Sequence, residues 1–153
     1  MREKALGYLA AHNVMAVSTF GPEGPWSAAV FYASRELTLY FVSSPKSRHA
    51  LDLARDPRAA AAIHEDYRDW RAIQGIQLAG TVQRLEGAER EAALACYQQK
   101  FSFLSNPVAE LVPVLQALGK AACYRLTPSE LHFIDNATGF GKRTQVLPHE
   151  AST

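Results

Sequence analysis

The sequence predicts an α+β fold that is mainly β, in which the strands form a small closed or nearly closed antiparallel barrel. The expected order of elements is one helix, three strands, a short helix, two strands, two helices and two strands. The loops between strands are short, which favours antiparallel neighbours, and closing such a sheet into a barrel removes its exposed edges. With 153 residues, the chain suits one domain with its own core.

The N-terminal third predicts one helix and three strands. Residues 2–11 carry apolar side chains at helical spacing, which predicts a short amphipathic helix. A turn at 20–25, rich in glycine and proline, and a polar break at 34–36 separate three β-prone runs, at residues 14–19, 26–33 and 37–42. We expect the third strand to pair back on the second as a hairpin.

The segment after the third strand predicts a helix with an unusual charge at its start. Serine is a favoured N-cap and proline a favoured first helical residue, so Ser44 and Pro45 predict a helix that ends near Asp56. Basic side chains follow in or near its first turn, where the helix macrodipole repels cations and attracts anions: Lys46, Arg48 and His49. An anion bound there would make this arrangement favourable.

Hydroxyl groups surround the same helix start, at Ser43, Ser44 and Ser47. Together with the basic side chains they predict a small phosphate cradle, because hydroxyls, cations and free N–H groups are the donors that phosphate accepts. The alternative is an ordinary solvated surface, since basic residues near exposed helix starts are common.

The middle of the chain predicts two more strands. Residues 59–64 form the first, although four consecutive alanines favour a helix by intrinsic propensity. After a polar loop at 65–71, residues 73–85 form a long strand. Its glycines, Gly75 and Gly80, indicate a bend, a bulge or a close approach of another backbone.

The C-terminal part predicts two amphipathic helices, at 88–101 and 109–118, and a final hairpin. The strands of this hairpin flank a turn rich in turn-forming residues, and they are expected at 121–126 and 131–135. A Gly-rich tail begins at residue 136. We expect a single domain at residues 1–143 and a C-terminal tail at residues 144–153.

Composition excludes several classes of protein. The formal net charge is +1, with acidic and basic residues interleaved, so binding to nucleic acid or to an anionic membrane is not expected. No apolar run approaches the length of a membrane span. Cys96 and Cys123 lack metal-ligand spacing and suit a reducing cytoplasm, which is the expected location.

Catalytic motifs are absent from the sequence. It contains no GxSxG, HExxH, P-loop or GxGxxG pattern, and its histidines have no spacing that predicts a metal site. A phosphate cradle without a nucleophile is expected where a phosphorylated cofactor performs the chemistry and the protein binds and orients it.

Three stretches carry a resemblance to a known family. They are LYFVSSPKSRHALDLARDPRAA at 39–60, PWSAAVFY at 25–32 and WRAIQGIQLAG at 70–80. Across residues 5–143 the chain resembles the pyridoxamine 5'-phosphate oxidase-like, flavin-binding split-barrel superfamily. The resemblance implies a six-stranded antiparallel split barrel, a homodimer, and flavin mononucleotide (FMN) held between the two subunits.

The resemblance also implies which residues bind FMN. The phosphate would lie after the third strand, the isoalloxazine along the second strand and near a glutamine of the fifth, and the C-terminal basic residues would reach across the dimer. The residues at these positions are Ser27, Ala28, Ala29, Val42, Ser43, Lys46, Ser47, Arg48, His49, Gln74, Gln77, Lys142 and Arg143.

One departure bears on the substrate. Pyridoxamine phosphate oxidases grip the substrate phosphate with an arginine and a histidine near the C-terminus, where this chain reads NATGFGKR at 136–143. The chain therefore looks more like an uncharacterised bacterial branch of the superfamily than like the vitamin B6 oxidase itself.

We expect an FMN-binding oxidoreductase whose small-molecule substrate the sequence does not identify, with reduced nicotinamide as one candidate electron donor. Two alternatives remain open at this point. One is a haem-binding or haem-degrading protein on the same barrel, and the other is a flavin-binding sensor or structural dimer without redox turnover.

Overall fold

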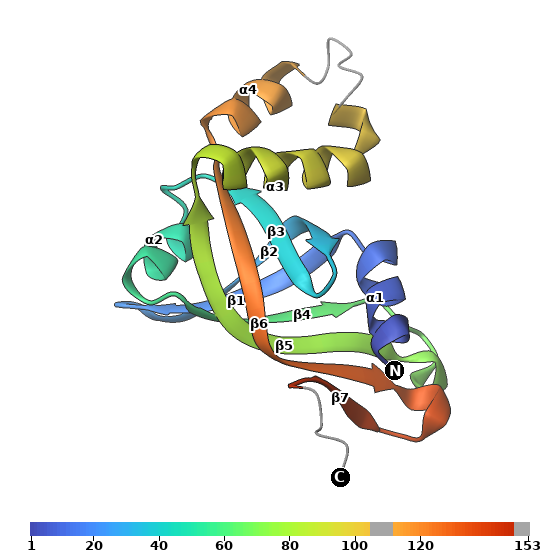
Figure 1. Cartoon of the computed structure of the whole chain (residues 1–153). Helices are drawn as coiled ribbons and strands as arrows, with labels where there is room; N and C mark the ends of the chain where they lie inside the picture. Colours follow the sequence, from blue (N-terminus) through green and yellow to red (C-terminus); the bar gives the residue numbers. More distant parts are fainter. Residues whose placement is uncertain (105–111, 149–153) are drawn as a thin grey trace.

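The computed structural model of the chain describes residues 1–104 and 112–148. Six strands form a closed antiparallel barrel (Figure 1), in the order β3-β2-β1-β4-β5-β6, and the pairing of β3 with β6 closes it. Their bounds are β1 (Val14–Gly21), β2 (Gly24–Arg35), β3 (Thr38–Ser43), β4 (Arg58–His64), β5 (Gln74–Leu85) and β6 (Ala122–Asp135). The predicted α+β fold and six-stranded antiparallel split barrel are therefore confirmed.

Helices cover the barrel on two opposite sides and above it. In Figure 1, α1 (Arg2–Ala11) and α2 (Arg48–Arg55) lie on opposite sides of the barrel, and α3 (Gly87–Lys100) and α4 (Val112–Lys120) lie above it. Short 3₁₀ helices occur at η1 (Trp70–Ala72), η2 (Ser102–Leu104) and η4 (Asn136–Thr138). Of the helix predicted at 109–118, residues 109–111 lie outside the described residues and the rest is α4.

The barrel interior is filled by alternate residues of the strands. The largest fully buried side chains include Tyr32, Phe41 and Phe133, from β2, β3 and β6. Leu9 of α1 and Leu53 of α2 join the same core cluster, so these two helices close the interior. Burying each large apolar side chain contributes about 1.5–3 kcal/mol, so this interior is the main source of stability.

The alanine-rich segment is a strand, as predicted. β4 lies between β1 and β5 and pairs with both. Its side chains alternate, with Ala59 and Ala61 buried and Ala60 exposed. Two paired neighbours and an apolar interior outweigh the helix propensity of alanine, which is worth only tenths of a kcal/mol per residue.

The C-terminal hairpin predicted at 121–126 and 131–135 is wrong. β6 is one strand that pairs with β5 along its length, and the register shifts beside Gly80. A Cβ on Gly80 would overlap the Thr127 carbonyl oxygen and lie 2.8 Å from Pro128 Cα. The turn-forming residues therefore build a bulge, because the long partner strand supplies hydrogen bonds on both sides of it.

A further strand, β7 (Arg143–Leu147), pairs with the second half of β6. The division into a domain at 1–143 and a tail at 144–153 stays a prediction, although residues 143–147 join the sheet. In the part of the chain that the structure describes, none of the helices combines the length and the apolar character that crossing a membrane requires.

Candidate functional site

The segment between β3 and α2 forms a turn, and the helix begins after it. The Ser47 N–H donates to the Ser44 carbonyl oxygen at 3.0 Å, and the Ser47 hydroxyl donates to the same oxygen at 2.7 Å. α2 begins at Arg48 with Ser47 as its N-cap, so the helix start predicted at Ser44 and Pro45 is wrong. The two bonds to one carbonyl close the turn and delay the helix. Lys46 therefore lies exposed in the turn.

Two hydroxyl groups predicted to bind phosphate lie against the imidazole of a third predicted ligand, His49. His49 Nε2 lies 2.8 Å from Ser43 Oγ, at the end of β3, and 3.3 Å from Ser47 Oγ. His49 is buried, and burial lowers the pKa of its imidazole, while the nearby Asp52 carboxylate acts in the opposite direction. The imidazole is therefore mostly neutral at pH 7 and can exchange hydrogen bonds with both hydroxyls.

A buried carboxylate holds α2 against the barrel. Asp52 accepts a hydrogen bond from Thr19 Oγ1 of β1 at 2.9 Å. It also packs on Gly21, where a side chain would collide with the carboxylate. The first turn of α2 is thereby fixed beside the hairpin that joins β1 and β2.

Arg48 has a buried side-chain nitrogen that lacks a hydrogen-bond partner among the described residues. Its guanidinium lies 4.3 Å from the ring centroid of Trp26. One terminal nitrogen donates to the Glu23 carbonyl at 3.4 Å, and Nε lies 3.7 Å from the Glu23 carboxylate, beyond hydrogen-bond distance. Among residues 1–104 and 112–148, no group accepts a hydrogen bond from the buried Nε. A bound anion would complete this donor set.

The start of α2 offers further donors. Its first turn contains no acidic residue, and within the described chain the Ser47 side chain makes no capping hydrogen bond. The first N–H groups of a helix have no partner inside the helix, and the macrodipole attracts an anion to them. Hydroxyls, imidazole, guanidinium and N–H groups therefore fit the phosphate of FMN. We call Ser43, Ser47, Arg48 and His49 the phosphate cradle.

Small side chains line the outer face of β1, β2, β4 and β5. Cross-strand pairing places Ser27 opposite Ser18 and Ala29 opposite Ala16, and the same face continues over β4 and β5. We call this surface the small-residue face, and its members are Ala16, Ser18, Ser27, Ala29, Ala60, Ala62 and Ala79. Ala28, another predicted FMN contact, points the other way and packs against the core.

An open hollow of about 580 Å³ lies over part of the small-residue face. Phe20 and Pro25, at the β1–β2 hairpin, form one side of it, and Arg58 lies on another. Small side chains allow a planar group or a second sheet to approach the backbone closely. The hollow and the phosphate cradle both border the β1–β2 hairpin.

A second hollow, of about 170 Å³, brings together residues of β5, β6 and β7. Gln77 lies opposite His132 in the sheet, and Arg143 lines the same hollow. The Glu130 carboxylate lies 3.4 Å from His132 Nδ1. Gln77 and Arg143 were predicted separately, whereas sequence reasoning missed His132 and Glu130. Pairing residues 73–85 with one continuous strand through 122–135 would have revealed both His132 and Glu130 beside Gln77.

The remaining predicted residues lie elsewhere. Gln74 Nε2 donates to Asp135 Oδ1 at 3.3 Å. Lys142 is exposed in the loop before β7. Val42 packs against the cluster that α3 forms over β2 and β3. The structure thus groups eight of the thirteen predicted residues into a cradle, a face and a polar hollow, and it leaves Ala28, Val42, Lys46, Gln74 and Lys142 outside them.

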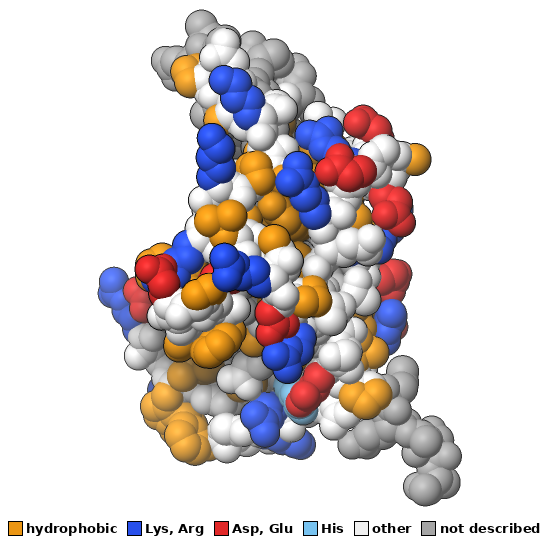
Figure 2. Space-filling view, turned by 90° about the vertical axis from the view of Figure 1, so that its left-hand side faces the viewer, with side chains coloured by type: hydrophobic (Ala, Val, Ile, Leu, Met, Phe, Trp, Pro, Cys, Tyr) orange, Lys and Arg blue, Asp and Glu red, His pale blue; other side chains and the backbone are white. Residues whose placement is uncertain are grey.

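Charge is mixed on the side of the molecule that bears α2. Figure 2 shows lysine and arginine side chains (blue) interspersed with acidic ones (red) and with hydrophobic patches (orange). A mixed surface lacks the extended field of one sign that recognises polyanions, so local donors such as those of the cradle determine which anions bind.

Comparison with known proteins gives a family match over most of the chain. The family model described as pyridoxamine 5'-phosphate oxidase matches residues 1–135. The chain is 31% identical over 138 residues to UPF0306 protein plu4501 of Photorhabdus laumondii. The aligned residues cover 89% of this chain and 88% of that protein.

Two solved structures share the fold. A heme binding protein from Mycobacterium smegmatis has a TM-score of 0.74 and 26% identity, covering 94% of this chain and 56% of that chain. The chain thus spans little more than half of that protein. HutZ, the heme storage protein of Vibrio cholerae, has a TM-score of 0.68 and 15% identity, covering 84% of this chain and 91% of its own.

The family match spans the strands and the helix that build the phosphate cradle and the small-residue face. The alignment of this chain with plu4501 covers most of both proteins and identifies the branch of the family. The chain belongs to the pyridoxamine 5'-phosphate oxidase-like superfamily, within the UPF0306 family.

Proposed function

We propose that the protein binds FMN in a homodimer and passes electrons between a small reductant, such as reduced nicotinamide, and a small-molecule acceptor. The observation that carries the proposal is the phosphate cradle, in which Arg48 Nε is a buried donor without an acceptor among the described residues. The family match supports a flavin as the phosphorylated ligand.

The position of the cradle suits an elongated ligand. Arg48 contacts Glu23 and Trp26, and the neighbouring Pro25 lines the open hollow over the small-residue face. Trp26 points to the opposite side of the hairpin from Ser27, so a ligand with its phosphate at Arg48 would pass the edge of the hairpin to place its planar rings over that face. Ser27 and Ala29 leave room there for an isoalloxazine.

Bound FMN would supply hydride and single-electron chemistry that no side chain of the protein provides. The residues of the chain bind and orient it. Ser43, Ser47 and Arg48 hold the phosphate, and the neutral His49 fixes the two hydroxyls. The small-residue face excludes water from one side of the rings.

A homodimer would cover the other side. Val14 and Phe31 are paired in the sheet and are about half exposed, at 44% and 53%, beside the small-residue face. Large apolar side chains around a flat surface of small residues are typical of an interface. We propose that a second copy of the chain packs there and completes the flavin site.

The test is an FMN titration of the purified protein, followed by its visible absorption and by quenching of flavin fluorescence. Wild-type protein is expected to show the paired flavin bands. Arg48→Ala should weaken binding by at least about tenfold, because a hydrogen bond to a charged group contributes about 1.5–3 kcal/mol. Arg55→Ala is the matched control, since Arg55 is exposed in the last turn of the same helix.

Equal affinity of the two variants would show that the cradle does not hold the phosphate. Absence of flavin bands from the wild-type protein, even with added FMN, would reject the proposal altogether. Bleaching of bound flavin by NADH or NADPH without oxygen tests electron transfer. If the bound flavin stays oxidised, the protein binds flavin but does not accept electrons from reduced nicotinamide.

Haem is the second candidate ligand, favoured by the likeness to the Mycobacterium smegmatis heme binding protein. Among the described histidines, His132 is the best candidate ligand, because its Nε2 makes no hydrogen bond to the residues that the structure describes and its ring lines the polar hollow. A shift of the Soret band of haem on adding the wild-type protein or His64→Ala, but not on adding His132→Ala, would support haem binding. An unshifted spectrum would exclude it.

A further inference from the structure

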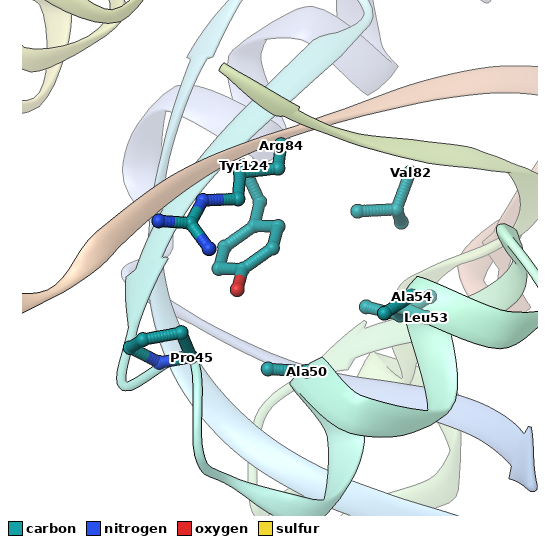
Figure 3. Close-up of a pocket in the computed structure, with 7 residues that line it drawn as sticks. All are labelled: Pro45, Ala50, Leu53, Ala54, Val82, Arg84 and Tyr124. Atoms are coloured by element: carbon teal, nitrogen blue, oxygen red, sulfur yellow. The ribbon is translucent and has the colours of Figure 1, made fainter. Parts of the chain in front are cut away.

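A third cavity lies between α2 and the strands β5 and β6 (Figure 3). Its volume is about 150 Å³. Ala50, Leu53 and Ala54 of α2 form one wall, and Val82 of β5 faces them. Pro45, from the turn that precedes α2, lies at the edge of the cavity. A cavity of similar size with apolar walls can hold a benzene ring.

The hydroxyl of Tyr124 points into this cavity (Figure 3). Tyr124 is only 4% exposed and stacks on Phe41, with the ring centroids 5.1 Å apart. No residue of 1–104 or 112–148 forms a hydrogen bond with its hydroxyl. Burial raises the pKa of Tyr124, and the nearby Arg84 acts in the opposite direction. The hydroxyl therefore stays protonated at neutral pH. It is not among the fully buried unpaired atoms of the described residues, so it is accessible from the cavity and can donate a hydrogen bond to a ligand there.

Arg84 adds a positive charge beside the hydroxyl. It lies directly opposite Tyr124 across the β5–β6 pair and lines the same cavity. Its Nε pairs with Glu86 Oε1 at 3.2 Å. The Arg84 side chain is 55% exposed, and its two terminal nitrogens have no acceptor among the residues that the structure describes, so they face solvent at the edge of the cavity. The cavity thus has apolar walls, and the Tyr124 hydroxyl and the Arg84 guanidinium lie at one side of it.

We propose that this cavity binds a small carboxylate with a compact apolar body, such as an aromatic or branched-chain acid. The body would lie between Val82 and α2, and the carboxylate would accept hydrogen bonds from Tyr124 and Arg84. A guanidinium matches the two oxygens of a carboxylate. The site is distinct from the cradle, whose donors belong to Ser43, Ser47, Arg48 and His49.

Benzoate is the probe for this site, with benzyl alcohol as the neutral probe of the same shape. Binding is followed by ¹H–¹⁵N NMR of the full chain without FMN. Benzoate is expected to shift the amides of Ala50, Val82 and Tyr124, and to bind more tightly than benzyl alcohol. Tyr124→Phe keeps the ring stack on Phe41 and should weaken benzoate binding by about two- to tenfold.

Two further variants separate the contributions. Arg84→Gln should remove the preference for benzoate over benzyl alcohol, and Ala50→Leu should fill the cavity and abolish binding of both. Tyr40→Phe and Arg71→Gln are the matched controls and should bind benzoate as the wild type does. Thermal unfolding of each variant checks that it is folded.

Three results would overturn the proposal. The first is that benzoate leaves the amides of the cavity unshifted, so that water alone fills the space. The second is that it shifts the amides of Ser43 to His49 instead, so that the anion sits in the cradle. The third is equal benzoate affinity in Tyr124→Phe, Ala50→Leu and the wild type. None of these depends on whether the protein binds FMN.

Discussion

His49 makes the stability of the protein depend on pH. Burial lowers its pKa below 6.5, the value in an unfolded chain. The unfolded state therefore binds more protons than the folded state between the folded pKa and 6.5, and stability falls as pH drops through that window. The slope for one group is limited to about 1.4 kcal/mol per pH unit. Above about pH 7.5 this dependence disappears.

We expect His49→Gln to remove this part of the acid-side loss. Urea unfolding at about pH 7.5, 6.5 and 5.5 measures the free energy of unfolding of both proteins, and the variant should show the smaller decrease. His64→Gln is the control, because His64 is exposed. A decrease that is the same in His49→Gln and the wild type would show that the imidazole of His49 is not held neutral.

At the scale of single residues, the sequence predicted the cradle because its members are neighbours in the chain. Ser43, Ser47, Arg48 and His49 meet even though the helix begins later than predicted, since one turn spans them all. Local sequence could not place Arg48 on Trp26, because that contact depends on how α2 packs against the β1–β2 hairpin.

Gly80 determines how two strands of the barrel pair. Its Cα lies against the bulge of β6, and a Cβ would lie 2.8 Å from Pro128 Cα. Because backbone atoms cannot move aside cheaply, we expect Gly80→Ala to destabilise the protein by about 2–4 kcal/mol in urea unfolding.

Gly7→Ala is the matched control for this substitution. Gly7 lies inside α1, and a Cβ there would meet nothing within 4 Å. Alanine should stabilise the helix by about 0.5–1 kcal/mol, because glycine loses more backbone freedom on folding. Two glycine variants with opposite signs are therefore expected, and a neutral Gly80→Ala would contradict the close approach.

Lys100 joins α3 to α1. Its Nζ donates to the carbonyl oxygens of His12 and Leu9, the latter at 3.3 Å, at the C-terminal end of α1. It also lies 4.1 Å from the ring centroid of Tyr32. The ammonium satisfies carbonyls that a helix leaves unpaired at this end, while burial lowers its pKa to about 8.

We expect Lys100→Met to lower the free energy of unfolding by about 1–3 kcal/mol, because carbonyls at the end of α1 lose a charged donor. Methionine keeps most of the apolar contact. Lys120→Met, at the exposed end of α4, should change stability by less than about 0.5 kcal/mol. Similar losses in both variants would mean that Lys100 contributes nothing specific to this junction.

At the scale of elements, patterns predicted five of the six barrel strands, whereas β6 was expected as a hairpin and its pairing with β5 decided the outcome. The period of 2 in residues 14–19 and 37–42 was sufficient for β1 and β3. The alanines of β4 and the turn-like Thr127 to Glu130 needed tertiary context, because β5 supplies backbone hydrogen bonds to both. Single-sequence reasoning had no access to that pairing, and it therefore missed His132 in the polar hollow.

At the scale of the whole molecule, the small-residue face stays exposed or half-exposed among the residues that the structure describes. Closing the barrel pairs β3 with β6 and buries the interior. It also turns the outer side chains of β1, β2, β4 and β5 to solvent, where a central group is small or apolar and is flanked by the polar side chains of Arg58, His64 and Gln77. A monomer gains nothing from such a face, whereas a second copy that covered it would bury apolar area on both chains.

We therefore expect Ala60→Arg to convert a dimer into a monomer. Ala60 is exposed near the centre of the small-residue face, between β1 and β5, so an arginine there would place a bulky charge in the interface without disturbing the core. Sedimentation equilibrium should give twice the chain mass of 16.8 kDa for the wild type and the single mass for the variant. Gln98→Arg, on the exposed side of α3, should stay dimeric. If the dimer survives in Ala60→Arg, the two subunits meet elsewhere.

FMN binding should fall in parallel with dimerisation in Ala60→Arg, because the flavin rings are proposed to lie between this face and its partner.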